Sequence, residues 1–207
     1  MATFKIIVTG ISTAATSLFI RTASISATKH GTPRLSVSDA ATLHRLSAAG
    51  LEVGYLPIDT DYALLLVGIA ASGLTEEVWE HLSIGKLGYV VLVDSCKPAT
   101  LTATQGLIRR FASLFQTPFV VAANKQDHLG ALPPSYIRTR LGLPCNVPVL
   151  PCIDYELRSV HTVLAALCTA IEARSTALLV GGSADDGERN NCTHSRRSAR
   201  LVRRWRF

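Results

Sequence analysis

A polar tetrad follows an apolar run in the middle of the chain, and its residue types match the hydrogen-bonding edge of a purine base. In Phe119–Asp127 (FVVAANKQD), the β-branched apolar residues predict a buried strand that leads into the polar NKQD tetrad. The Asp127 carboxylate can accept two parallel hydrogen bonds from an N–H and NH2 edge, which guanine presents and adenine does not. Lys125 can lie along a base, and the Asn124 amide can join neighbouring loops. The alternative is an ordinary polar turn.

The elements that must position this tetrad alternate between strands and helices. This alternation predicts an α/β domain with a six-stranded, mostly parallel sheet that helices cover on both faces. The Asp59–Asp61 turn predicts one early hairpin, and residues 26–50 and 68–73 predict a surface loop and a turn. The expected strands are Phe4–Thr9, Leu51–Ile58, Tyr62–Val67, Gly88–Val93, the strand from Phe119, and Val147–Leu150; the expected helices begin near Leu18, at Thr75 and at Pro133–Pro134, or contain Leu107–Phe115 and Val160–Ile171.

A second segment with binding chemistry follows the first expected strand. Gly10–Ser17 (GISTAATS) has the length and position of a phosphate-binding loop, whose pattern is GxxxxGK[ST]. Gly10, Gly68, Asn124 and Cys152 all come just after expected strands. Since ligands bind outside the carboxyl ends of strands in open α/β sheets, these positions predict one site at one edge.

With these motifs, and with YVVLVDS at Tyr89–Ser95, the sequence resembles Ras-like small GTPases. It is most similar to the bacterial branch that includes the gliding-motility switch GTPase, to Arf proteins and to the β subunit of the signal-recognition-particle receptor. The resemblance covers residues 2 to 173. It implies the P-loop NTPase fold, binding of GTP or GDP with Mg²⁺, a protein effector or regulator, and a role in signalling.

The resemblance also assigns roles to individual residues. It implies that Asn124, Lys125 and Asp127 bind guanine, and that the backbone of Cys152 and Ile153 meets the carbonyl oxygen of guanine. The implied phosphate-binding residues, with Ser17 also as the Mg²⁺ ligand, are Gly10, Ala14, Ala15, Thr16 and Ser17.

The chain departs from the family pattern where phosphate should bind. Ala15 replaces the second glycine of the loop, and Thr16 replaces its lysine. Gly68–Gly73 contains no glutamine that could orient a water molecule. Losing the lysine should weaken triphosphate binding by roughly tenfold to a hundredfold, because a charged hydrogen bond contributes roughly 1.5–3 kcal/mol. No catalytic residue is assigned, and Asp94 is expected to be a loop-capping carboxylate rather than an acid catalyst.

Two function classes therefore stay open. The first is a switch or scaffold that binds guanine nucleotide through NKQD, with weak or absent GTP hydrolysis. The second is a nucleotide-independent protein-interaction module, a pseudo-GTPase on the same fold. An intact phosphate-binding lysine would have decided for the first class.

Charge and composition divide the chain at residue 174. Residues 174–207 carry eight arginines against three acidic residues, so most of the net charge of +6 lies there. We expect residues 1–173 to form the G domain and residues 174–207 a basic tail. We expect this tail to be disordered and solvated; because it alternates Arg with apolar residues, the alternative is a basic amphipathic helix that binds an anionic membrane surface or RNA.

Three further features concern the compartment. The sequence has no apolar run long enough to span a membrane, and its first residues (MATFKIIVTG) predict a strand rather than a signal peptide. The five cysteines are odd in number and widely spaced, which favours reduced thiols. We therefore expect a cytoplasmic location.

Overall fold

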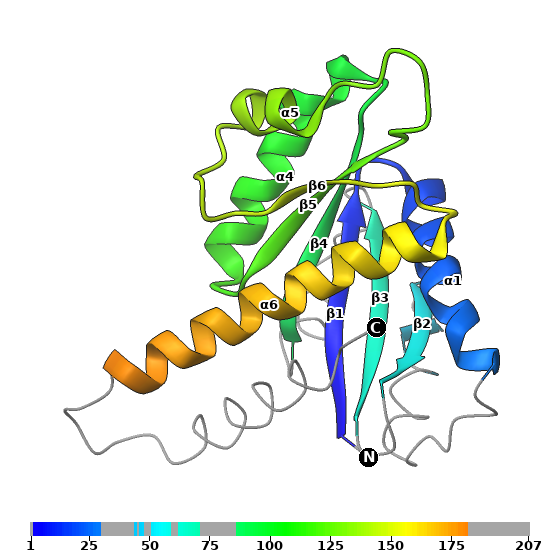
Figure 1. Cartoon of the computed structure of the whole chain (residues 1–207), viewed down its shortest axis with the longest axis vertical. Coiled ribbons are helices and arrows are strands. Elements are labelled where there is room, and N and C mark those ends of the chain that lie inside the picture. The colour runs from blue at the N-terminus through cyan, green and yellow to red at the C-terminus, as the bar shows by residue number, and fades with distance from the viewer. Residues whose placement is uncertain are drawn as a thin grey trace.

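The computed structural model describes residues 2–29, 44, 46–47, 51–58, 62–70 and 86–181. Their strands form one six-stranded sheet in the order β2-β3-β1-β4-β5-β6 (Figure 1). All neighbouring strands are parallel except β2 and β3, which are antiparallel and form the predicted hairpin. The strands are β1 (Ala2–Gly10), β2 (Glu52–Pro57), β3 (Tyr62–Ala70), β4 (Lys86–Asp94), β5 (Phe119–Asn124) and β6 (Val149–Pro151).

Helices cover both faces of this sheet, as alternation along the chain predicts. On one face, side chains of β1 such as Ile6 pack against Phe19 of α1 and Leu164 of α6. On the other face, Ile7 and Tyr89 pack with Phe111 of α4 in a separate core. The helices are α1 (Thr13–Lys29), the 3-10 turn η2 (Pro98–Thr100), α4 (Leu101–Leu114), α5 (Pro134–Leu141) and α6 (Leu157–Gly181).

Several expected boundaries differ from the structure. α1 begins at Thr13, five residues before the expected start, and runs to Lys29, four residues into the expected loop. β3 continues through Gly68 to Ala70, so Gly68 lies inside a strand and not in a turn. The sequence pattern ended this strand too early because glycine is usually unfavourable within a strand. Here the missing side chain of Gly68 makes room for a helix. The expected helix from Thr75 lies outside the described residues.

The last helix is longer than the sequence pattern indicates. α6 continues past residue 174 to Gly181, so the expected domain boundary falls inside a helix. Ser175 is buried, which shows that the helix still packs on the domain there. The rest of the basic tail lies outside the described residues. None of the described helices has the length and apolar character needed to cross a membrane.

Candidate functional site

A pocket of about 190 Å³ lies at the carboxyl edge of the sheet, where β1 and β4 diverge toward different connections. This is the topological switch point, because the chain leaves β1 toward β2 and β3 on one side of the sheet and leaves β4 toward β5 and β6 on the other. The pocket is smaller than the roughly 300 Å³ of a typical small-molecule site, so in this arrangement it would hold only part of a nucleotide. Its lining includes Ser12, Ala15, Asp94, Lys97, Asn124 and Lys125.

Asn124, at the end of β5, joins the polar tetrad to the loop after β6. Its Nδ2 donates to Asp154 Oδ2 at 2.6 Å, and its Oδ1 accepts from the Asp154 backbone N–H at 3.0 Å. Both residues are buried. A buried carboxylate without a partner is costly, so this two-point contact strongly fixes the two loops relative to each other. The predicted role of Asn124 in tying neighbouring loops together is confirmed.

Lys125 combines an unusual backbone conformation with an ion pair. Its φ of 66° is the one positive φ of a non-glycine residue in the described part of the chain. Backbone strain of this kind gathers at functional sites, where the surrounding contacts over-determine it. Lys125 Nζ donates to Asp94 Oδ2 at 2.7 Å, and this bond raises the pKa of the lysine. Asp94 Oδ1 also accepts from the Cys96 N–H at 3.0 Å, so the expected loop-capping role of Asp94 is confirmed.

Gln126, the third residue of the tetrad, holds the turn in place through hydrogen bonds to neighbouring loops. Its Nε2 donates to Ser95 Oγ at 2.8 Å and to the Leu132 carbonyl at 3.0 Å. Its backbone N–H donates to the Cys152 carbonyl at 3.2 Å. These contacts connect the ends of β4, β5 and β6, so the turn is held from three directions.

Asp127 projects from this braced turn and contacts the loop after β6. Tyr155 donates its hydroxyl hydrogen to Asp127 Oδ2 at 2.5 Å. This hydrogen bond lowers the pKa of Asp127 and raises the pKa of Tyr155. His128 lies 3.7 Å from the same carboxylate. Asp127 is thus held as an anion, the state that can accept hydrogen bonds from a base.

Cys152 and Ile153, predicted to offer backbone N–H groups to guanine, use those groups inside the chain. The Cys152 N–H donates to the Ala123 carbonyl at 2.8 Å, and the Ile153 N–H donates to Ser159 Oγ at 2.8 Å. Neither group is available to a base in this arrangement. Burial also raises the pKa of the Cys152 thiol to about 12, which keeps it protonated and unreactive.

The Gly10–Ser17 segment forms a helix start rather than a wide loop. Ser12 Oγ accepts from the Ala15 N–H at 3.4 Å, as an N-cap residue does. The Thr16 N–H donates to the Ser12 carbonyl at 3.2 Å, and the Thr16 hydroxyl donates to the same oxygen at 3.1 Å. Two of the backbone groups expected to meet phosphate are therefore already bonded.

The side chains of this segment point in different directions. Thr16 is buried on the face of α1 that packs against β3, where its Cγ2 would be 3.0 Å from a Cβ added at Gly68. Ser17, the predicted Mg²⁺ ligand, donates to Glu52 Oε2 at 3.2 Å, and Glu52 also pairs with Arg21 at 3.3 Å. With Glu52 shared in this way, the residues present do not fit a magnesium site, and we derive no step through the metal.

Three other residues of the segment have distinct environments. Ala14 is exposed, and Ala15 lines the pocket. Gly10 ends β1, where an added Cβ would lie 2.9 Å from the Leu92 carbonyl oxygen. The glycine at position 10 is therefore required by the close approach of β1 and β4.

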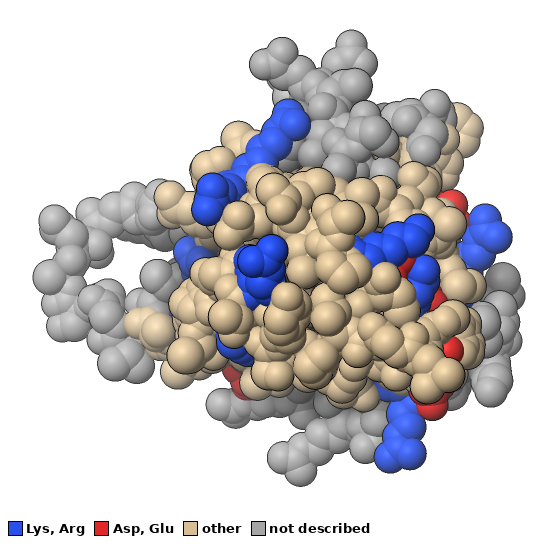
Figure 2. Space-filling view, turned by 90° about the horizontal axis from the view of Figure 1, so that it is seen from above, with Lys and Arg blue, Asp and Glu red and all other residues tan. Residues whose placement is uncertain are grey.

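Three residues at this edge have no role in the sequence-based site: Asp154, Tyr155 and Lys97. The loop after β6 can be located from the pattern of strands, but its pairing with Asn124 cannot be read from sequence because 30 residues separate the partners. Lys97 brings positive charge to the pocket, where Lys125 is already paired with Asp94. Figure 2, which views the molecule from above Figure 1, shows Lys and Arg side chains spread over this face.

The comparisons with known proteins agree with the fold. The solved structure of the Arl6/BBS3 small GTPase from Trypanosoma brucei, with the bound nucleotide analogue GppNp, matches 83% of this chain and 99% of its own. The TM-score is 0.59 and the sequence identity is 15%. No protein-family model matches the chain, and no curated protein sequence matches it. The chain therefore has the α/β fold of small GTPases, a fold that many different functions can share.

Proposed function

We propose that this protein is a small-GTPase-like binding protein that recognises guanine nucleotides mainly through the base and hydrolyses GTP weakly or not at all. The observation that carries the proposal is the braced turn at Asn124–Asp127. Hydrogen bonds to distant residues hold Asn124 and Gln126, a strained backbone at Lys125 turns the chain, and Asp127 projects from it as an anion. Guanine offers the N–H and NH2 pair that such a carboxylate accepts.

Weak phosphate binding and weak hydrolysis follow from the Gly10–Ser17 segment. Its amides at Ala15 and Thr16 already donate to Ser12, and the Thr16 side chain is buried. Phosphoryl transfer depends almost entirely on positioned charge and positioned donors. A site that lacks the loop lysine and uses these amides internally has lost much of that machinery.

Binding of GDP, XDP and ADP to the protein and to the Asp127→Asn variant tests the base-reading role. In the variant, an amide N–H2 faces the guanine donors, so GDP should bind at least about tenfold more weakly. XDP has a carbonyl where guanine has the amine and should bind the variant better than the parent protein. ADP should bind both poorly. Equal affinities for all three nucleotides in both proteins would contradict the proposal.

A control and a turnover assay complete this test. Asp185→Asn, a change of the same kind in the basic tail, should leave all three affinities unchanged. Phosphate release from GTP by the parent protein should remain near the level of the buffer. Turnover comparable to that of an active small GTPase would contradict the proposed loss of hydrolysis.

A nucleotide-independent interaction module is the second candidate, and one observation favours it. The Ala15 N–H, the Ser17 hydroxyl and the Asp127 carboxylate all have partners within the chain, so these groups do not require a ligand. Acid release of nucleotide from the purified protein, followed by ion exchange, separates the two candidates. Bound guanine nucleotide supports the first, and absence of both bound nucleotide and GDP affinity supports the second.

Other sequence-based assignments remain proposals of lower detail. They are membership of the bacterial branch, a signalling role with a protein effector or regulator, a cytoplasmic location, and binding of the basic tail to an anionic membrane or RNA. The tail assignment can be tested by deleting residues 182–207, which leaves α6 intact. Vesicle or RNA binding should disappear while the melting temperature stays the same.

A further inference from the structure

The lining of the pocket at the switch point includes two lysines, Lys97 and Lys125, and they differ in whether their charge is paired. Lys125, the lysine of the tetrad, is paired with Asp94 at 2.7 Å, so these two charges largely cancel. Position 16, where a phosphate-binding loop carries its lysine, is a threonine buried against the sheet. Neither position supplies a cation that is ready for an anionic ligand.

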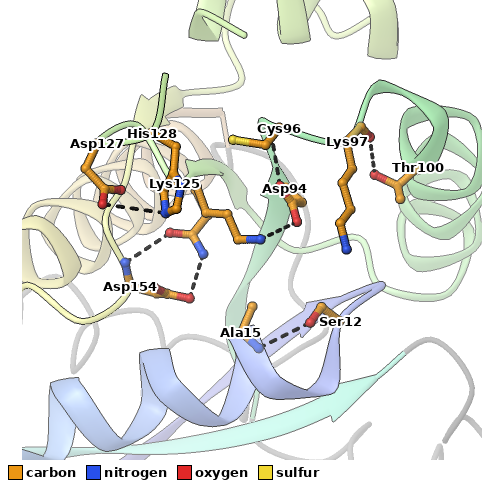
Figure 3. Close-up of polar contacts among 11 residues, drawn as sticks. Ser12, Ala15, Asp94, Cys96, Lys97, Thr100, Lys125, Asp127, His128 and Asp154 are labelled. Carbon is orange, nitrogen blue, oxygen red and sulfur yellow. Dashed lines mark hydrogen bonds and ion pairs between the residues drawn. The ribbon is translucent and has the colours of Figure 1, made fainter. Parts of the chain in front are cut away.

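Lys97 stands on the opposite wall of the same pocket. It lines the pocket together with Ser12 and Ala15 of the α1 start, although it comes from the connection between β4 and α4. In Figure 3 its side chain extends from that connection toward Ser12, with the ammonium end leading. In the described part of the chain, its ammonium makes no hydrogen bond and no ion pair.

The backbone at Lys97 is fixed even though its side chain is exposed. The Lys97 N–H donates to the Asp94 carbonyl at 3.1 Å. The Lys97 carbonyl accepts from the Thr100 N–H at 3.0 Å and from the Thr100 hydroxyl at 2.8 Å. These bonds, with Pro98 at the start of η2, set the direction in which the lysine leaves the chain. Because the backbone of Lys97 is fixed, less entropy is lost when its side chain becomes ordered on a ligand.

We propose that Lys97 is the phosphate-binding lysine of this protein, supplied by the β4–α4 connection in place of the loop lysine lost at Thr16. The proposal rests on the proposed function, because it assigns the phosphates of the same nucleotide to the wall opposite the base-reading turn. A nucleotide whose base contacts Asp127 would extend its phosphates past Lys125 into the pocket. There Lys97 meets them as a point charge, the way in which lysine binds phosphate.

Binding of three probes measures this role separately from base recognition. The probes are guanosine, GDP and inorganic tripolyphosphate, tested by calorimetry on the parent protein and on Lys97→Ala. We expect the parent to bind GDP more tightly than guanosine. Lys97→Ala should lose about tenfold to a hundredfold in affinity for GDP and for tripolyphosphate, while its affinity for guanosine stays the same.

Two further variants control for charge and for folding. Arg109→Ala removes one exposed positive charge from α4 outside the pocket lining, and it should leave all three affinities within about twofold. Lys97→Arg keeps the charge and should retain most of the tripolyphosphate affinity. Because Lys97 is exposed, its replacement should leave the melting temperature unchanged, so lost binding reports on contact and not on unfolding.

Each outcome decides between the two proposals. If Lys97→Ala binds GDP and tripolyphosphate as the parent does, the Lys97 proposal is wrong. If the parent binds guanosine and gains nothing from the phosphates of GDP, base recognition stands and the Lys97 role fails. If guanosine does not bind but tripolyphosphate binding requires Lys97, the anion site stands and the guanine site fails. Binding of none of the probes would overturn both.

Discussion

The Asn124–Asp127 turn and the Gly10–Ser17 segment lie at the same edge of the sheet, but their polar groups are used in different ways. In the turn, Asn124 and Gln126 bond to distant elements, and these bonds present Asp127 to solvent. In the segment, Ser12 satisfies its own helix, and Ser17 is engaged by Glu52. The first arrangement positions a functional group, and the second stabilises a helix.

Under the proposed function, this difference explains how a phosphate-binding segment would lose its function while the fold persists. A helix start needs a cap and a buried face, and Ser12 and Thr16 supply both without glycine or lysine. A turn that carries a strained residue has no such substitute, because only a full set of long-range contacts maintains φ = 66° at Lys125. The retained contacts around the turn are therefore the stronger sign of function.

Replacing Thr16 with lysine should disrupt the packing of the Gly10–Ser17 segment, and we expect it to have the largest effect on stability of the variants considered. The Thr16 side chain is buried against β3, so a lysine there would place an unpaired ammonium in the core or force α1 to move. We expect the free energy of unfolding to fall by about 3 kcal/mol or more. Leu18→Lys, at an exposed position of the same helix, should change it little.

Urea denaturation of the two variants measures this difference. The result also decides whether the loop can be repaired, since a variant with Ala15→Gly and Thr16→Lys would restore phosphate affinity only if position 16 reached the pocket. Stable folding of Thr16→Lys with a gain in tripolyphosphate affinity would contradict the structure of this segment.

Replacing Asn124 with alanine should disrupt the Asn124–Asp127 turn, and we expect it to have the next largest effect on stability. The change removes two hydrogen bonds and leaves the buried Asp154 carboxylate without its amide partner. We expect a loss of about 2–3 kcal/mol in unfolding free energy, together with loss of guanosine binding. Asn146→Ala, in an exposed loop, is the matched control and should have no effect on either quantity. Equal behaviour of the two variants in chemical denaturation would argue against the bracing role.

Replacing Gly10 with alanine tests whether this glycine is needed for the close packing of β1 against β4. An alanine there would bring its Cβ to 2.9 Å from the Leu92 carbonyl oxygen, so β1 and β4 must separate. We expect a loss of about 1–2 kcal/mol. Gly106→Ala on α4 is the opposite case, because no atom lies within 4 Å of its added Cβ. That variant should be stabilised by up to about 1 kcal/mol, and thermal denaturation of both would show whether the signs differ.

The smallest expected effect concerns the hydrogen bond from Tyr155 to Asp127. Tyr155→Phe removes it, so the pKa of Asp127 should rise toward its ordinary value. Because the folded-state pKa is lowered, the stabilisation that Tyr155 provides is present above the unfolded pKa of about 3.9 and is lost as pH falls through the folded value. The variant should lose this pH dependence, and with it a small part of its stability at neutral pH, because Asp127 is exposed and its hydrogen bond is screened by solvent. NMR titration of the Asp127 carboxyl checks this, with Tyr136→Phe as an exposed control.

Much of the fold could be predicted from sequence because its signals are local. Apolar runs located β1, β4 and β5, the Pro133–Pro134 pair located the start of α5, and the hairpin signal located β2 and β3. The extent of β3 was missed for a reason of packing. Gly68 lies in a strand because Thr16 and Ile20 need its space, and this fit depends on the packing of two elements.

The sequence by itself determined the chemistry available at the edge: a carboxylate, a lysine and an amide after one strand, and no lysine in the phosphate-binding segment. Those features depend only on residue type and on position in the chain. Only the tertiary structure decided how they are used. It bonded Asn124 to Asp154, turned Thr16 into the core, engaged Ser17 with Glu52, and brought Lys97 to the pocket. These contacts join residues far apart in the chain, and their partners are set by sheet order and helix packing, which no local pattern encodes.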